Sequence, residues 1–148
     1  MGRIEAICIS REKGSVKESV PRAELRAGHG IVGDAHAGDW HRQVSLLARE
    51  SIETVREIIP DLADGAFAEN LIVSGLPLQT TTVGDRLIVG AGVVLEVTQI
   101  GKECHNGCAI RQKTGDCIMP REGIFCRVLS GGPIEPGETV SLGDAAGV

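Results

Sequence analysis

The chain has 148 residues, of which 42% are hydrophobic and 24% are charged, so we expect residues 1–148 to form one globular domain with its own core. Its net charge of −5 argues against nucleic-acid binding, which needs a broad basic surface. No apolar stretch is long enough for a signal peptide or a membrane helix, so we expect a cytoplasmic protein without membrane partners.

Short strands are predicted along most of the chain, because 20 glycines and six prolines make turns frequent. Apolar runs of strand length occupy residues 3–10, 43–48, 71–73, 86–89, 93–100, 124–129 and 139–142. Gly90-Ala91-Gly92 is a plausible tight turn between two of these runs. The pattern predicts a mainly β, compact, barrel-like fold in which most strands are antiparallel.

One helix is predicted over residues 50–59. Ile52, Val55 and Ile59 recur at helical spacing and form a single apolar stripe, and Pro60 stops the helix. A second, weaker helical piece is predicted over residues 62–67. The fold should therefore contain one or two short helices.

Residues 26–41 are rich in glycine and carry three of the four histidines without any regular period. We interpret them as an ordered loop, and long loops of this kind are often functional. His36 and His41 flank Trp40 and could line the same pocket as the thiols, or they could be hydrogen-bonded parts of the scaffold. Arg42 could bind an anionic group or simply mark an exposed start of a strand.

Three polar residues are expected to serve the scaffold instead. Asp34 is expected to structure its loop by accepting hydrogen bonds from backbone donors. Glu69 and Asn70 are expected to fix a turn or cap a helix end rather than touch a substrate.

The five cysteines divide into two groups. Cys8 and Cys126 lie in apolar runs and are interpreted as core residues. Cys104, Cys108 and Cys117 follow the predicted strand 93–100 in a polar, glycine-containing stretch. An odd count in a chain of this kind does not indicate a disulfide framework.

The three clustered thiols could act as reactive thiolates. Nearby positive groups lower the pKa of a thiol, and Lys102, His105 and Arg111 lie close to Cys104 and Cys108 in the sequence. Residues 101–127 hold five cations against three anions, a local charge of +2 that leaves −7 for the rest of the chain. A thiolate in such a basic stretch could accept a sulfur atom as a persulfide.

Other uses of the same segment stay open. Cys104, His105, Cys108 and Cys117 supply the four ligands that tetrahedral zinc requires, but only one C-x3-C unit is present, with Cys117 alone, where structural zinc sites usually have paired C-x2-4-C units. A single thiolate could instead bind a larger metal cofactor. Simple packing is a further reading, and the C-x3-C spacing does not match the C-x2-C motif of thiol–disulfide oxidoreductases.

Several motifs together resemble the MOSC family, the molybdenum-cofactor sulfurase C-terminal domain. They comprise residues 33–38 (GDAHAG), 42–47 (RQVSLL), 67–71 (FAENL), 75–76 (GL), 83–87 (VGDRL), 100–110, 123–134 and 137–140 (GETV). They cover nearly the whole chain, in the order of the family. The chain thus resembles a small, stand-alone bacterial member.

This resemblance implies a β-barrel-like fold and a cysteine that carries sulfur or faces a molybdenum–pterin cofactor. The family's key cysteine matches Cys108 best, with Cys104 second. In multi-domain sulfurases a separate pyridoxal-phosphate domain mobilises the sulfur, and 148 residues leave no room for it. A partner such as a cysteine desulfurase, a cofactor-biosynthesis protein or a molybdoenzyme would then donate or receive the sulfur.

The leading hypothesis is a sulfur carrier or molybdenum-cofactor-binding domain. Cys108 and Cys104 are its candidate catalytic residues, and Cys108 and Cys117 its candidate metal ligands. The predicted cofactor-binding residues are Lys102, His105, Arg111, His36 and Arg42. The alternatives are a molybdenum-dependent reductase of N-hydroxylated compounds and a non-catalytic, zinc-stabilised module.

Overall fold

The computed structural model describes residues 2–12, 17–101 and 123–143. The described strands are β1 (Gly2–Ile9), β2 (Glu18–Val20), β3 (Ala23–Arg26), β4 (Gly30–Ile31), β5 (Val44–Ala48), β6 (Leu71–Ser74), β7 (Arg86–Val89), β8 (Val93–Ile100), β9 (Ile124–Ser130), β10 (Gly132–Ile134) and β11 (Thr139–Gly143). Within these ranges there is one α-helix, α1 (Arg49–Arg56), and one short 3-10 turn, Leu78–Thr80. The prediction of a mainly β protein is therefore confirmed.

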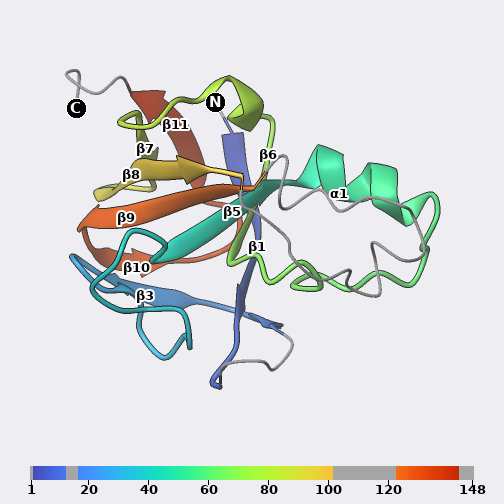
Figure 1. Cartoon of the computed structure of the whole chain (residues 1–148), viewed down its shortest axis with the longest axis horizontal. Helices are drawn as coiled ribbons and strands as arrows, with labels where there is room; N and C mark the ends of the chain where they lie inside the picture. The colour runs from blue at the N-terminus through green and yellow to red at the C-terminus, as the bar shows by residue number, and fades with distance from the viewer. Residues whose placement is uncertain (1, 13–16, 102–122, 144–148) are drawn as a thin grey trace.

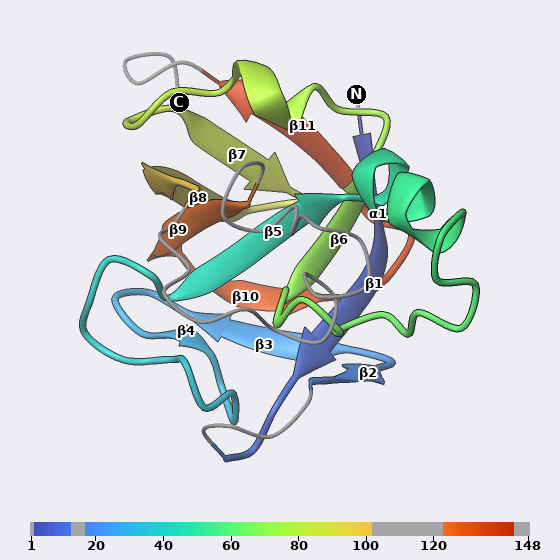
Figure 2. The same ribbon diagram turned by 45° about the vertical axis from the view of Figure 1, so that its right-hand side comes forward.

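Seven strands close into a barrel in the order β11-β7-β8-β9-β5-β6-β1, and pairing between β1 and β11 completes the circle. Strand β2 pairs with the far end of β1, at Ile7–Ile9, on the side of β1 opposite β6. The predicted tight turn at residues 90–92 joins β7 and β8, whose ends pair as Val89 with Val93. Figures 1 and 2 show the barrel strands wrapped around a common interior.

Strands β5 and β6 run parallel, whereas all other pairs between described strands are antiparallel. Parallel neighbours need a crossover connection, and α1 lies in that connection. Ile52 and Val55 are buried against the sheet, as the apolar stripe predicts. The helix ends at Arg56, three residues before the predicted end, although Ile59 still packs against the same cluster.

The prediction of a second helical piece over residues 62–67 is wrong. These residues form turns, and Gly65 has a positive φ of 93° that interrupts a right-handed helix. Gly65 also lies so close to Lys17 that a Cβ atom would come within 2.4 Å of the Lys17 carbonyl oxygen. Leu62 and Phe67 are nevertheless buried, in the same cluster as Ile52 and Val55 of α1.

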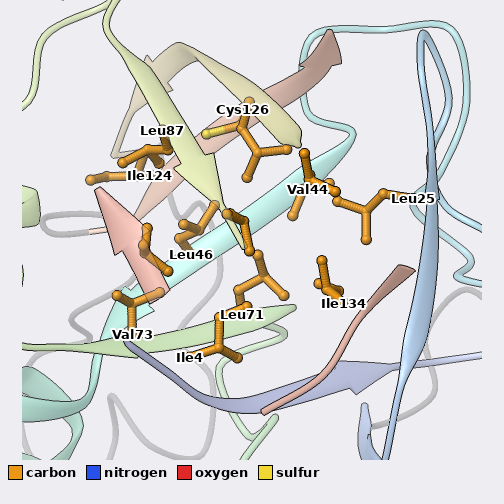
Figure 3. Close-up of a cluster of buried hydrophobic side chains, with 14 of the residues drawn as sticks. Ile4, Leu25, Val44, Leu46, Leu71, Val73, Leu87, Ile124, Cys126 and Ile134 are labelled. Carbon is orange, nitrogen blue, oxygen red and sulfur yellow. The ribbon is translucent and has the colours of Figure 1, made fainter. Parts of the chain in front are cut away.

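The loop predicted over residues 26–41 contains some regular structure. Arg26 ends β3, and residues 30–31 form β4, so the prediction of a loop without strands is wrong at these positions. Together with β10 these strands form a small three-stranded sheet, which lies below β9 in the view of Figure 1. Leu25 and Ile134 from this sheet enter the main hydrophobic core (Figure 3).

A β-bulge divides the side chains of β1 between two cores. Its register against β6 shifts between Ile4 and Ala6, so Ile4 and Ile7 both enter the barrel interior. Ala6 and Cys8 join the second cluster, beneath α1. Since side chains alternate along a strand, one inserted residue is enough to exchange the faces.

The sequence predicts no membrane helix, and the structure can be compared with this prediction over the described residues. Among the described residues, no helix combines the length and apolar character needed to cross a membrane.

Candidate functional site

A pocket of about 130 Å³ opens where the loop before β5, the segment before β6 and the start of β9 meet. It is lined by His36, Trp40, Arg42, Ser45, Ala68, Asn70 and Phe125. A wider hollow of about 290 Å³ lies along the end of β1 and β2, but its charged residues are exposed. The smaller pocket brings together a cation, a histidine and aromatic rings, as small-molecule sites commonly do.

Arg42 is held in the pocket wall by two neighbours. Its Nε donates a hydrogen bond of 3.0 Å to Gln99 Oε1, and its guanidinium carbon lies 5.2 Å from the centre of the Phe125 ring. Gln99 is itself oriented, because its Nε2 donates to the Gly101 carbonyl at 2.7 Å. A guanidinium fixed in this way suits an anionic group.

His36 is anchored to a buried ion pair. Lys17 Nζ lies 2.7 Å from Asp34 Oδ1 and 2.9 Å from His36 Nδ1. Trp40 Nε1 donates to the His36 carbonyl oxygen at 2.7 Å, which fixes the backbone on the other side. Asp34 also accepts bonds from the Ser10 and His36 backbone amides, so the prediction that it structures its loop is confirmed.

The floor of the pocket is a network of satisfied polar groups. Asn70 Oδ1 accepts from the Ser45 amide, and Asn70 Nδ2 donates to the Cys8 carbonyl, both at 3.0 Å. Ser45 Oγ donates to the Ala68 carbonyl at 3.1 Å. Ala68 has a φ of 64°, a left-handed conformation that L-residues rarely adopt and that is often found at functional sites.

Glu69 is turned away from this pocket and serves the fold. Its carboxylate accepts hydrogen bonds from the Gly65 amide at 3.0 Å and the Phe67 amide at 2.9 Å. Burial raises the pKa of Glu69, although these backbone bonds oppose the shift. The prediction that Glu69 fixes a turn is confirmed.

The described residues on either side of the thiol-bearing sequence 102–122 are hydrogen-bonded to each other. Gly101, directly after β8, donates a hydrogen bond of 2.6 Å to the carbonyl of Gly123, directly before β9. Two positions further into the β8–β9 ladder, Gln99 pairs with Phe125. Six predicted site residues lie outside the described residues: Lys102, Cys104, His105, Cys108, Arg111 and Cys117.

The two cysteines assigned to the core are buried as predicted. Burial raises the pKa of the Cys8 thiol to about 12, and burial also raises the pKa of the Cys126 thiol. Both therefore stay protonated at neutral pH, which agrees with a packing role in the core. The described ranges also contain no cluster of three or more histidine, cysteine or acidic side chains that could hold a metal ion.

The two other predicted cofactor-binding residues, His36 and Arg42, line the same pocket. His41 lies outside its lining: it is exposed, and its Nε2 lies 2.9 Å from Gln99 Oε1. Sequence reasoning missed Lys17, Gln99 and Phe125. Lys17 lies in a polar stretch, where no local pattern indicates a buried partner.

Comparison with known proteins agrees with this architecture. A family model of the MOSC domain matches residues 33–141. No curated protein matches the chain.

Solved structures of low sequence identity share the fold. The YuaD protein from Bacillus subtilis has a TM-score of 0.78 at 22% identity, covering 96% of each chain. YiiM from Geobacillus stearothermophilus has a TM-score of 0.70 at 20% identity, covering 97% of this chain and 76% of its own. YiiM from Escherichia coli has a TM-score of 0.62 at 18% identity, covering 95% and 69%. Because the family model spans well over half of the sequence and the barrel agrees with it, the chain belongs to the MOSC domain family.

Proposed function

We propose that this MOSC domain carries sulfur for, or binds, the molybdenum–pterin cofactor through a reactive cysteine. Membership of the family supports a role connected with the molybdenum cofactor. Cys108 is the proposed sulfur acceptor or metal ligand, and Cys104 and Cys117 are auxiliary thiols. Lys102 and Arg111 would stabilise the thiolate and an anionic ligand.

One observation carries this proposal: Gly101 and Gly123, the described residues on either side of the thiol-bearing sequence 102–122, lie two strand positions from the residues that hold Arg42. Gly101 and Gly123 are joined by a hydrogen bond, and the second pair inward along the strands, after Ile100 and Ile124, is Gln99 with Phe125. These two residues are the ones that position the Arg42 guanidinium. The candidate anion site thus lies at the end of the β8–β9 ladder where β8 ends and β9 begins.

The described residues fit part of such a cofactor. Arg42 can pair with a phosphate group, and the rings of Trp40 and Phe125 offer flat apolar surface for a heteroaromatic ring. The pocket volume of about 130 Å³ suits one group of the cofactor rather than the whole molecule. Its thiolate ligand would come from Cys108, since Cys8 and Cys126 are held as buried thiols.

When bound, the cofactor would supply a redox-active molybdenum ion. In the sulfur-carrying role, the thiolate of Cys108 attacks the outer sulfur of a persulfide on a donor protein, such as a cysteine desulfurase. A new S–S bond forms at Cys108, the donor S–S bond breaks, and the donor cysteine leaves as a thiolate. No external oxidant is consumed, because the transferred sulfur keeps its oxidation state.

Intact-mass spectrometry after incubation with a cysteine desulfurase and cysteine tests the proposal, together with elemental and pterin analysis of natively purified protein. We expect the wild type to gain one sulfur atom or to contain molybdenum and pterin. Cys108→Ser should lose this behaviour, whereas the matched control Cys8→Ala should keep it because Cys8 is buried. Absence of persulfide, molybdenum and pterin from the wild type would refute the proposal.

The same samples separate the two other functions. Turnover of hydroxylamine-type substrates by cofactor-loaded protein with an electron donor would identify a molybdenum-dependent reductase. Stoichiometric zinc, with unfolding on chelation, would identify a zinc-stabilised module.

A further inference from the structure

We infer that Lys17 is a positioning residue that holds the pocket residue His36 in its Nε2–H tautomer. His36 would then line the pocket as a hydrogen-bond donor rather than as a base. This assignment concerns which nitrogen of the ring carries the proton, and it holds whatever ligand the pocket binds.

The geometry around Lys17 leaves its ammonium group three acceptors. Nζ lies 2.7 Å from Asp34 Oδ1, 2.9 Å from His36 Nδ1 and 3.4 Å from Ser10 Oγ. The Lys17 side chain is 1% exposed and that of Asp34 is fully buried, so water does not compete for these bonds. Paired with a buried carboxylate, Lys17 is a cation.

An ammonium group has three N–H donors and no lone pair. His36 Nδ1 must therefore accept the hydrogen bond, and an accepting nitrogen carries no proton. A proton on Nδ1 would place two donors 2.9 Å apart and, in the imidazolium form, a second positive charge against a buried cation. The single proton of the neutral ring is consequently on Nε2.

The arrangement is held by backbone contacts from several segments. Asp34 Oδ1 accepts the Ser10 amide at 3.0 Å, and Oδ2 accepts the His36 amide at 3.3 Å. Trp40 donates to the His36 carbonyl. The close approach of Gly65 to the Lys17 backbone fixes the other end of the lysine. The ring cannot change tautomer without breaking a bond of this buried cluster.

The tautomer has a consequence for ligand selection, and this step rests on the proposed function of the pocket. Arg42 and His36 both line the pocket, and with the proton of His36 on Nε2 both side chains carry N–H donors. Such a pair favours ligand atoms that carry lone pairs, such as phosphate or oxo oxygens, over groups that are themselves N–H donors. Lys17, which is outside the pocket lining, would thus help to determine the chemistry that the pocket accepts.

Long-range ¹H–¹⁵N correlation spectra of uniformly ¹⁵N-labelled wild-type protein at pH 7 test the assignment. The signals of His36 are identified by their loss in His36→Gln. We expect Nδ1 to resonate as an unprotonated nitrogen and Nε2 as a protonated one, with at least about a tenfold excess of this tautomer. A dominant Nδ1–H form, an even mixture or an imidazolium ring would overturn the inference.

Two further measurements test the role of Lys17 itself. A scalar coupling between Lys17 Nζ and His36 Nδ1 in the wild type would show the hydrogen bond directly, and its absence would count against the inference. In the double variant Lys17→Met/Asp34→Asn, which removes both buried charges together, the Nδ1–H form should become detectable. An unchanged tautomer in that folded variant would show that Lys17 is not the cause.

His41 is the internal control, because its Nε2 is partnered by Gln99 and not by Lys17. Its ring signals should not change in the double variant. These spectra need no cofactor, so a failure here leaves the proposed function standing. Conversely, absence of molybdenum, pterin and persulfide would leave the tautomer assignment standing.

Discussion

Two ionic clusters, one at Lys17 and Asp34 and one within the β5–α1–β6 crossover, differ in burial. In the pocket cluster, Lys17 and Asp34 are almost completely withdrawn from water. In the helix cluster, Arg49 binds both carboxylate oxygens of Asp64, at 2.8 and 3.1 Å, but the side chains are 18% and 25% exposed. Arg56 adds a third contact to Asp64, at 2.7 Å.

The two clusters differ in how much each ion pair contributes to the free energy of unfolding and in how firmly it orients its neighbours. A buried pair gives up the hydration of two charges, so its attraction adds little net stability, but breaking it is costly. A partly exposed, bidentate pair gives up less hydration and can contribute a modest net stabilisation. The pocket cluster therefore suits orientation of His36, and the helix cluster suits attachment of α1 to the turn that follows it.

The largest effect is expected from Lys17→Met, which leaves Asp34 buried without its cation. We expect the free energy of unfolding to fall by about 3–5 kcal/mol, as measured by urea denaturation. The double variant Lys17→Met/Asp34→Asn should recover a large part of this loss. Arg22→Met, at an exposed cation, is the control and should change little. Equal losses in the single and double variants would contradict the description of a buried pair.

Asp64→Asn should cost about 1 kcal/mol at pH 7, a value reduced for partial exposure. The hydrogen bond with Arg49 holds the pKa of Asp64 below its usual range. Its stabilisation is therefore fully present above the unfolded pKa of about 3.9 and is lost as the pH falls through the folded pKa. The difference from wild type should shrink in acid, whereas the exposed control Asp61→Asn should show no such dependence.

Salt should change the stability loss caused by a substitution in the helix cluster but not in the pocket cluster, and this effect is smaller than the two above. At about 1 M NaCl the screening length falls to about 3 Å, so the cost of Asp64→Asn should drop by a few tenths of a kcal/mol. The cost of Lys17→Met should stay the same, because buried charges are screened much less. Denaturation curves of both variants at low and high salt measure the difference. A common salt dependence would mean that water reaches both clusters equally.

The smallest effect is expected from Glu53→Gln on the exposed face of α1. Glu53 Oε1 lies 2.6 Å from Arg56 Nη1, but the Glu53 side chain is 51% exposed. We expect a loss of about 0.3 kcal/mol, typical of such helix pairs. Glu57→Gln, at an exposed position just beyond the helix, is the matched control. A loss above about 1 kcal/mol would show that Glu53 belongs to the stabilising part of the cluster.

Much of the fold could be predicted because the spacing of apolar residues within a few positions indicates each strand and the helix. Strand β8 buries Val93, Leu95 and Val97 in strict alternation, and the sequence shows the same period of two. The apolar stripe of α1 likewise reports which face is buried. Cys8 and Cys126 were separable from the other thiols for the same reason, since each lies in an apolar strand.

The site was predicted in part, because two of its residues carry chemical signals of their own. His36 and Arg42 were identified as a histidine and a cation in and after a glycine-rich loop, and both line the pocket. Phe125 and Gln99 were missed, because their roles come from strand pairing across β8 and β9. Lys17 and Asp34 are 17 residues apart, and nothing local indicates that they meet.

The sequence by itself determined the alternation of the strands, the helix stripe and the burial of Cys8 and Cys126, because each depends on neighbours within a few residues. The tertiary structure alone decided the bulge that sends Ile4 and Ile7 to one core, and the left-handed turn at Gly65 against Lys17. It also decided the buried contact between Lys17 and His36. These features depend on register and close approach between distant segments, which only the assembled barrel specifies.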